Sequence, residues 1–313
     1  MKSKKPVPAD IPRYPLHKFR PVHRMDEDGP DFGYNAIGKI HIIEGFELFS
    51  SEGMIREAMG PFKSEFYRIS VTVSGMLDMQ IGLEHFHNQA RTVAFTYPNQ
   101  ILSKRNASPD AFGYYILFEP RFLEEIVPSV KITEEFPFYD PSGVPLFQLS
   151  ESEISRIIDL ILRINEELQH QETGRVRAVK MYVYLILLEA RRSYERQQLG
   201  QEAPVRDSNY ILSQFRRLVG QHYLTKRKVN DYAGMLSITP NHLNRVIKEL
   251  TGGTASDSIQ EMLLQEAKAL LKYTDSTISE IAYKLQFSDP SSFVRFFKST
   301  SKQTPKDFRL MSK

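Results

Sequence analysis

Hydrophobic and polar positions alternate with a period of two in the N-terminal half of the chain. In YRISVTVS, residues 67–74, every second position is apolar. This pattern is typical of a β-strand with one buried face and one face in water. Short apolar or alternating runs, separated by turn residues, recur at 76–83, 92–97 and 114–118. The sequence therefore predicts a β-sandwich or β-barrel in this region.

The periodicity changes to helical after Pro145. The run ESEISRIIDLILRINEELQ, beginning at Glu151, places six apolar residues on one stripe, and Ser150 or Ser152 is a candidate cap for its start. Gly174 separates it from a second amphipathic helix that ends near residue 198. From residue 209 onward the pattern indicates only helices and short turns. We therefore divide the chain into a sensing domain at 1–150, a helical pair at 151–199, a linker at 200–208 and a helical domain at 209–313.

The helical domain contains two segments with the same plan. In KVNDYAGMLSITPNHLNRVIKELTG, a short helix, a break and a second helix beginning at Pro240 follow each other, with Thr239 as the expected cap. ISEIAYKLQFSDPSSFVRFFKST repeats this plan, with Asp289 and Pro290 at the corresponding positions. A short turn between two helices is the helix-turn-helix signature. We expect Leu250 and Phe296 to pack inward in these units.

A third helix, about 20 residues long, is expected between the two units. At about 1.5 Å per residue its length is close to the repeat of B-DNA, so it could place two helices in successive major grooves. Residues 207–313 carry 16 Lys and Arg against 10 Asp and Glu, whereas residues 1–206 carry 25 against 28. A basic segment of this kind favours a polyanion partner, although a solvated basic face without a partner would have the same charge.

The outward-facing residues of the second helix in each unit suit DNA recognition. Arg pairs with guanine acceptors, Asn pairs with adenine, and Lys and Ser reach phosphates. The candidates are Asn241, Asn244, Arg245 and Lys248 in the first unit and Ser291, Ser292, Arg295 and Lys298 in the second.

The segment from about 210 to 311 resembles the arabinose-regulator (AraC) family of bacterial transcription factors. The resemblance is carried by TPNHLNRVIKELTG, LLQEAKALLKYTDSTISEIAYKLQFSD and SSFVRFFKSTSKQTPKDFR. It implies an α+β protein with an N-terminal cupin-like β-barrel, a helical dimerisation segment and a C-terminal all-α domain of two helix-turn-helix units. By position it adds His242 to the DNA-contacting set, although His242 could instead pack at its helix start.

The family resemblance also implies a sequence-specific regulator, more often an activator, with double-stranded DNA, RNA polymerase and a second copy of the chain as partners. This sequence departs from the family pattern at Gln286 and Lys302, where Gly is usual, and at Ser292, where an aromatic is frequent. A left-handed backbone at Lys302 would cost on the order of 1 kcal/mol.

The N-terminal domain has candidate residues for sensing a small-molecule effector. Aromatic residues that could line a pocket, or simply form the core, are Phe66, Tyr67, Phe95, Tyr97, Tyr114 and Tyr115, and the preferred candidates are Tyr67, Phe95, Tyr97 and Tyr114. The N-terminal arm, residues 1–12, could close on such a ligand as in the arabinose regulator. The pair His85 and His87 resembles part of a cupin metal site, but no third ligand follows at a suitable spacing, so we expect no metal and no cofactor.

Composition narrows the function classes further. The chain has 313 residues and no cysteine, which excludes disulfides and thiolate chemistry. No signal peptide or bilayer-spanning run is recognised, so we expect a cytoplasmic protein without a membrane partner. No catalytic motif is found, and we expect no enzymatic activity. The alternatives left open are a cupin-type metalloenzyme with an appended DNA module and an architectural DNA-binding protein of low specificity.

Overall fold

The computed structural model describes residues 13–14, 16, 19, 32–35, 41–52, 58–126, 132–141, 143–199 and 208–312. Contacts between residues group the chain into two compact units. The N-terminal unit contains residues 14–59 and 64–201, and the C-terminal unit contains residues 202–313 with 60–63 and 1–13. The expected arm at 1–12 and residues 200–207 of the expected linker lie outside the described residues. The protein is α+β, as predicted, with strands in the first unit and helices in the second.

The strands and short helices of the N-terminal unit precede two long helices. The strands are β1 Arg13–Tyr14, β2 Phe46–Ser50, β3 Ala58–Ser64, β4 Tyr67–Ser74, β5 Met76–Ile81, β6 Glu84–Gln89, β7 Thr92–Thr96, β8 Leu102–Arg105, β9 Phe112–Phe118 and β10 Leu146–Gln148. The helices are η1 Gly33–Asn35, α2 Ile132–Glu135, η2 Pro137–Tyr139, α3 Glu151–Gln169 and α4 Arg175–Arg196.

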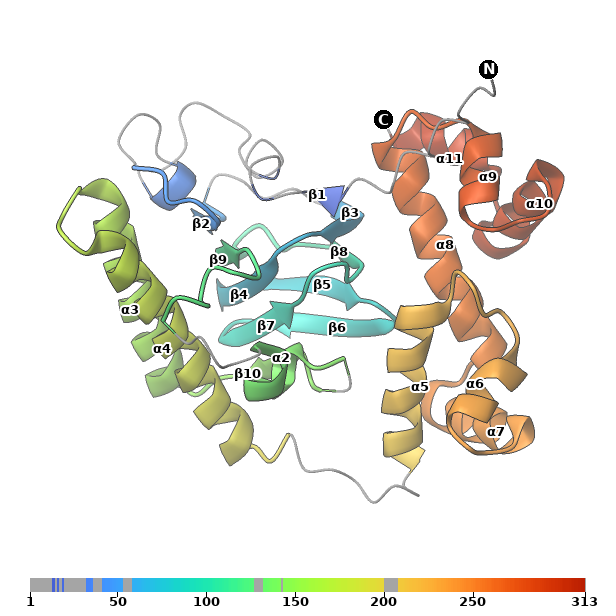
Figure 1. Cartoon of the computed structure of the whole chain (residues 1–313), viewed down its shortest axis with the longest axis horizontal. Helices are drawn as coiled ribbons and strands as arrows, with labels where there is room; N and C mark the ends of the chain where they lie inside the picture. The colour runs from blue at the N-terminus through green and yellow to red at the C-terminus, as the bar shows by residue number, and fades with distance from the viewer. Residues whose placement is uncertain are drawn as a thin grey trace. The chain divides into compact units, whose positions relative to one another are not determined.

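The described strands form two separate five-stranded sheets. One has the order β10-β7-β4-β9-β2 and the other has the order β1-β3-β8-β5-β6 (Figure 1). The edge strands of one sheet are not hydrogen-bonded to those of the other, so the prediction of a closed barrel is wrong for these residues. The alternating pattern could not distinguish a sandwich from a barrel, because both need one inward face per strand.

The strand β4 is buried on both faces, contrary to the expectation of one wet face. Ile69 and Val71 are buried on one side, and the polar residues Arg68, Ser70 and Thr72 are buried on the other. The apolar side continues across the sheet in Phe95, whose ring stacks on other aromatic rings. The polar side faces the second sheet. Alternation in the sequence therefore identified the two faces correctly but not what covers the polar one.

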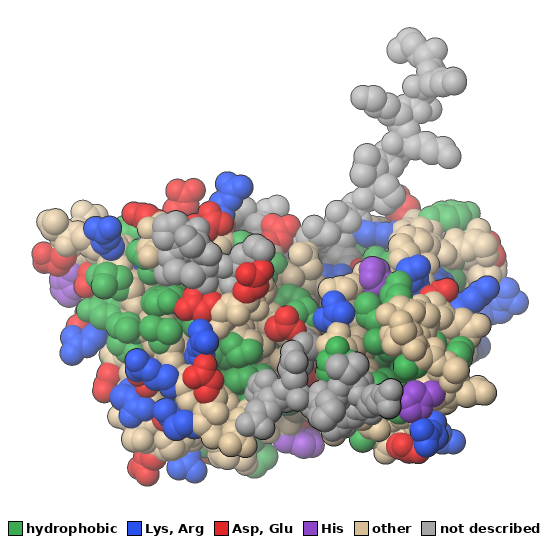
Figure 2. Space-filling view, turned by 60° about the horizontal axis from the view of Figure 1, so that its bottom comes forward, with side chains coloured by type: hydrophobic (Ala, Val, Ile, Leu, Met, Phe, Trp, Pro, Cys, Tyr) green, Lys and Arg blue, Asp and Glu red, His purple; other side chains and the backbone are tan. Residues whose placement is uncertain are grey.

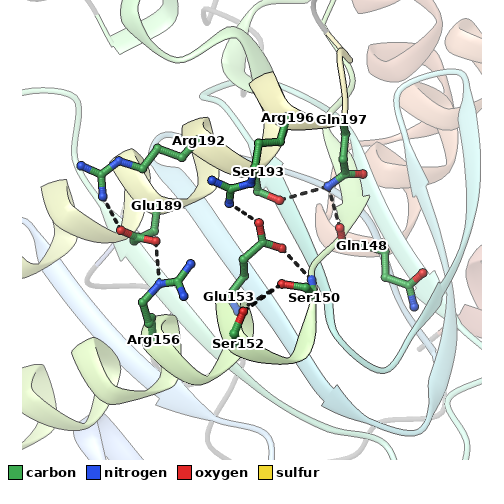
Figure 3. Close-up of polar contacts among 10 residues, drawn as sticks. All are labelled: Gln148, Ser150, Ser152, Glu153, Arg156, Glu189, Arg192, Ser193, Arg196 and Gln197. Atoms are coloured by element: carbon green, nitrogen blue, oxygen red, sulfur yellow. Dashed lines mark hydrogen bonds and ion pairs between the residues drawn. The ribbon is translucent and has the colours of Figure 1, made fainter.

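The helices α3 and α4 pack against each other as a hairpin around Gly174, which precedes α4 with a φ of +82°. Ser150 caps α3 through a capping box with Glu153. Polar contacts then join the two helices near this end (Figure 3): Glu153 pairs with Arg196, and Glu189 pairs with Arg156 at 2.9 Å. Glu153 thus holds the start of α3 and the end of α4 at once.

From residue 208 onward, the described part of the C-terminal unit consists of helices joined by short turns. Its helices are α5 Ser208–His222, α6 Val229–Met235, α7 Pro240–Thr251, α8 Ala255–Tyr273, α9 Ile278–Lys284, α10 Pro290–Ser301 and α11 Pro305–Ser312. The pairs α6–α7 and α9–α10, called here the first and second bihelical units, lie at the two ends of α8 (Figure 1). No helix in the described part of the chain is both long and apolar enough to cross a membrane.

Two residues of the second bihelical unit have a left-handed backbone although they are not glycine. Gln286, in the turn after α9, has a φ of +59°, and Lys302, after α10, has a φ of +66°. The corresponding turn of the first unit has Ser237 at +54°, and α7 ends on Gly252 at +77°. A non-glycine residue in this conformation costs about 1 kcal/mol. Lys302 therefore has the left-handed backbone whose cost was considered from the sequence.

The Glu153 carboxylate generates a prediction about acid stability. Burial would raise its pKa, but hydrogen bonds from Arg196 and Ser150 outweigh this and lower the pKa to about 2. Because the folded pKa lies below the unfolded one, its contribution is complete above about pH 4.5 and is lost as the pH falls towards 2. We expect Glu153→Gln to lower the unfolding free energy at neutral pH by about 2 kcal/mol, with a smaller difference from wild type at acid pH.

Urea unfolding across this pH range would measure the effect. The matched control is Glu151→Gln, since Glu151 is an exposed acid in the same helical turn. Equal stability of Glu153→Gln and Glu151→Gln at neutral pH would contradict the assigned role of Glu153.

Candidate nucleic-acid interface

The helix α7 presents one polar face because both of its ends are fixed. The Thr239 hydroxyl accepts a hydrogen bond from the backbone N–H of His242 at 3.2 Å, and Pro240 occupies the first turn. The opposite face is anchored by Leu243, Val246 and Ile247, which are buried. The exposed candidates on α7 are Asn241, Arg245 and Lys248.

The other two candidates on α7 have contacts within the unit. The Asn244 side-chain oxygen accepts a hydrogen bond from the backbone N–H of Ala255 at 3.2 Å, which ties α7 to the start of α8. His242 Nδ1 lies 3.1 Å from Nη2 of Arg245, and His242 is half-buried. Asn244 therefore supports the helix packing, and His242 positions the guanidinium of Arg245.

The helix α10 is built in the same way. Asp289 accepts hydrogen bonds from the backbone N–H and the hydroxyl of Ser292, at 2.8 and 2.7 Å. These bonds lower the pKa of Asp289 to about 2, so the cap is ionised at neutral pH. Arg295 in turn donates to the Ser292 hydroxyl at 3.3 Å. Ser292 is thus occupied by the cap, while Ser291, Arg295 and Lys298 are exposed.

Two residues expected to pack inward do so only in part or not at all. Leu250, near the end of α7, is 42% exposed. Phe296 is half-buried, with its ring 5.3 Å from that of Phe287. The core of the second bihelical unit instead rests on Phe293 and Phe297, which are fully buried. Lys and Arg side chains reach the surface of the C-terminal unit (Figure 2).

Arg227 links the two bihelical units and was not singled out from the sequence. It precedes α6, yet its guanidinium donates a hydrogen bond to the carbonyl oxygen of Leu285, at the end of α9. The same guanidinium lies 4.4 Å from the centre of the Phe287 ring. Its partial burial lowers the pKa of Arg227. A lone Arg before a helix has no sequence signal that would distinguish this role from a solvated cation.

The aromatic residues proposed to line an effector pocket do not gather in one place. The rings of Tyr67 and Phe95 both contact Tyr139, at 4.9 and 5.4 Å. Tyr114 contacts Phe32 and Phe112 instead. Burial raises the pKa of Tyr97 to about 12.

A surface pocket of about 310 Å³ is lined by other residues of this unit, namely Leu16, Glu65, Glu119, Pro120 and Arg121.

The two histidines considered as metal ligands lie on the exposed face of β6. His87 Nδ1 is 2.7 Å from Oδ1 of Asp78, and Oδ2 of Asp78 accepts a hydrogen bond from Asn106 at 2.6 Å. His85 is exposed on the same face. Among the described residues, no group of three or more His, Cys, Asp or Glu side chains is arranged to hold a metal ion.

These features define a helical domain in which two helices with exposed polar faces lie at the ends of one buried helix. Residues 232–311 match the helix-turn-helix domain family model. The predicted resemblance is confirmed: this part of the chain is a helix-turn-helix domain of the AraC type.

Relatives with curated names are similar to the chain over longer or shorter stretches. The HTH-type transcriptional activator RhaS of Salmonella dublin is 25% identical over 202 residues, which are 64% of this chain and 66% of RhaS. The match thus spans just under two thirds of that relative. The HTH-type transcriptional regulator GlxA of Rhizobium meliloti is 36% identical over 80 residues, 26% of this chain and 25% of GlxA.

Solved structures are similar to the chain at low identity, over most of its length in one case and about a third in another. ToxT from Vibrio cholerae is 14% identical, with a TM-score of 0.40, and the match covers 86% of this chain and 99% of ToxT. A transcriptional regulator with an AraC-type DNA-binding domain from Chromobacterium violaceum is 23% identical, with a TM-score of 0.32 over 34% of this chain and 94% of that chain.

The position of Arg227 generates a prediction about the C-terminal unit. Arg227→Met removes the hydrogen bond to Leu285 and the cation–π contact with Phe287, so we expect the unfolding free energy to fall by about 1–2 kcal/mol. Urea unfolding followed by helical circular dichroism would measure this change. Lys228→Met is the control, because Lys228 is exposed and adjacent. A variant at Arg227 as stable as this control would show that the link contributes nothing.

Proposed function

We propose that this protein is a sequence-specific DNA-binding transcription regulator that reads two successive major grooves with α7 and α10. The observation that carries the proposal is the repeated construction of the two bihelical units, each with an exposed Arg and Lys on its second helix. These are Arg245 and Lys248 on α7, and Arg295 and Lys298 on α10. Such side chains read base edges and hold phosphates.

The length of α8 supports readout of two grooves. The helix has 19 residues, so it is about 28 Å long, against about 34 Å for one turn of B-DNA. Its buried side chains include Ile259, Leu263 and Leu270. A buried helix does not bend easily, so it would hold the two bihelical units at a fixed separation. Two short boxes, about one helical turn apart, are the expected target.

The remaining parts of the proposal rest on the relatives and on the N-terminal unit. Activation rather than repression is supported by the name of RhaS, which is a transcriptional activator. RNA polymerase would be the partner that an activator recruits. The two-sheet unit would act as a cupin-like sensing domain that responds to a small effector. The hairpin of α3 and α4 would form a homodimer, because Leu162, Met181 and Leu185 are large apolar side chains exposed on it.

The experiment that tests this function is selection of DNA from a random duplex pool. The full chain would be mixed with the pool at near-physiological salt, and the bound DNA would be sequenced. Enrichment of two boxes about one helical turn apart is the expected result. Binding without enrichment would favour the architectural alternative, in which phosphates provide the affinity and its dependence on salt is steep. Absence of DNA binding, with or without small-molecule additives, would contradict the proposal.

The alternative of a metalloenzyme with a DNA module has a separate test. Its candidate ligands would be His85 and His87, the two histidines exposed on β6. Dialysis of the purified chain against Zn²⁺, followed by metal analysis, would show one tightly held ion per chain if this alternative is correct.

Arg245 is expected to contact a base. Its side chain is exposed, and its guanidinium is oriented by His242. We expect Arg245→Ala to weaken binding to the selected site by about 1–3 kcal/mol and to relax preference at one base position. Lys306→Ala, at an exposed cation on α11, is the control for lost charge. An equal loss of affinity on all sequences would identify Arg245 as a phosphate contact instead.

The dimer is expected to form through the exposed apolar side chains of α3 and α4. Met181→Asp places a charge in this surface, so we expect a dimer for the wild type and a monomer for the variant in light scattering at micromolar concentration. Met311→Asp is the control, since Met311 is an exposed methionine in the C-terminal unit. A monomeric wild type would contradict the dimer, and an unchanged dimer in Met181→Asp would place the interface elsewhere.

A further inference from the structure

The interior between the two sheets of the N-terminal unit is polar on the side contributed by β4. Arg68, Ser70 and Thr72 alternate with the apolar residues of the strand and are 1%, 3% and 5% exposed. The pairing of β4 with β9 places Tyr115 directly beside Ser70 and on the same face. An ordinary sandwich core would be apolar here, so this face needs a physical explanation.

The second sheet adds another cation to the same interior. Lys104 on β8 pairs with Met79, which is fully buried, so both side chains lie on the inward face. The ammonium of Lys104 lies 3.9 Å from the centre of the Tyr115 ring and also hydrogen-bonds that residue. Lys104 therefore reaches from one sheet to the other. The guanidinium of Arg68 packs 4.9 Å from the centre of the Phe19 ring in the same unit.

The protonation behaviour of these groups shows that the local potential is positive. Burial lowers the pKa of Lys104, and the charge of Arg68 lowers it further. Burial also lowers the pKa of Arg68, to about 10. Burial alone would raise the pKa of Tyr115, yet Lys104 and Arg68 together bring it below its usual value. A phenol whose ionisation is favoured in a buried place lies in a field that attracts anions.

Carboxylates in the described part of the chain do not neutralise Lys104. Among the described residues none lies within ion-pair distance of its ammonium, and Tyr115 and Arg68 are the charged or ionisable groups that act on it. Glu47 is buried in the first sheet. It pairs with Leu117 on β9, and Leu117 pairs in turn with Arg68 on β4. Glu84, at the end of β6, pairs with Ile81 on the inward face of the second sheet. Neither residue shifts the pKa of Lys104.

An unsatisfied amide lies on the same inward face. Asn88 on β6 pairs with Leu77 and is 1% exposed. Neither its side-chain oxygen nor its side-chain nitrogen has a hydrogen-bond partner among the described residues. Burying such a group without partners costs about 1–3 kcal/mol. Lys104 and Tyr115, by contrast, keep some accessible surface although their charged and polar groups are desolvated. This combination is typical of residues that line an internal binding site.

We propose that the space between the two sheets is a binding site for a small organic molecule bearing an oxyanion, either a carboxylate or a phosphate. The oxyanion is held by the ammonium of Lys104 and the hydroxyl of Tyr115, and the guanidinium of Arg68 adds positive charge. Asn88 offers both a donor and an acceptor to the polar remainder of the ligand. Apart from Tyr115, the site differs from the aromatic set first considered, since it uses the polar face of β4. Its role as an effector site rests on the proposed regulatory function. Binding of the oxyanion does not depend on that function.

The test uses the full chain and three defined probes: butyrate, succinate and inorganic phosphate. Calorimetric titration and thermal unfolding would be carried out with each probe at constant ionic strength, set by chloride. We expect saturable binding of at least one probe, with an increase in Tm. A carboxylate source is indicated if succinate or butyrate binds, and a phosphate source if phosphate binds.

Variants assign the binding to the inner faces. Lys104→Met is expected to weaken binding at least tenfold, because it removes the charge-assisted hydrogen bond. Tyr115→Phe, which removes only a hydroxyl, is expected to weaken binding less. It tests the site even if Lys104→Met does not fold. Arg105→Met is the matched control: Arg105 is the next residue of β8 and is exposed on the outward face. Binding by none of the probes, or equal binding by Lys104→Met and Arg105→Met, overturns the proposal.

The DNA selection described above separates this inference from the proposed function. A chain that selects a DNA site but binds no probe refutes the oxyanion site and leaves the regulator intact. A chain that binds a probe through Lys104 but selects no DNA refutes the regulator and leaves a small-molecule site. If both hold, adding the bound probe during DNA binding shows whether it changes affinity for the selected site.

Discussion

Burial of the helix α8 is the constraint on which the C-terminal unit depends. Helices from both bihelical units, with α5 and α11, pack against it, and the apolar residues along its length are buried. Because packed interiors tolerate little displacement, the positions of α7 and α10 follow from that of α8. The hydrogen bond from Ala255 to Asn244 fixes α7 at one end of α8, and Arg309 donates to the carbonyl of Leu271 at the other. The polar faces of α7 and α10 are left exposed because their apolar faces pack against α8 and its neighbouring helices.

The sequence predicted the C-terminal unit well because its signals are local. A capping residue followed by proline, as at Thr239 and Asp289, marks a helix start within a few residues. The apolar spacing then shows which side of the helix is buried. The same reasoning failed at Leu250, which belongs to the apolar pattern but lies near the end of α7 and is exposed. It could not identify the role of Arg227 either, since the hydrogen bond from Arg227 to Leu285 joins residues 58 positions apart.

The N-terminal unit was less predictable because its sheets depend on long-range pairing. Alternation in β4 revealed two faces, and the apolar one was correctly taken as buried. The polar face was expected in water, but the second sheet covers it, and nothing in the local pattern records that sheet. The local pattern also does not show which aromatic rings pack together. Tyr67 and Phe95 were pocket candidates, and in the structure their rings contact Tyr139. The residues in the polar interior, Arg68 and Lys104, were not considered because charged residues in strands usually face solvent.

Different unfavourable free-energy contributions occur in the two units of the protein. In the C-terminal unit the cost is conformational: Gln286 and Lys302 hold left-handed backbones that favour glycine. These strained residues lie in the turn before α10 and at its end, so they set where that helix begins and stops. In the N-terminal unit the cost is electrostatic, since two cations and an unsatisfied amide are buried between the sheets. Folding alone gains nothing from this arrangement, because apolar residues of similar size would pack there without desolvating charge. Binding an anion would recover part of that energy, and the affinity for the anion would then grow with the desolvation already present in the free protein.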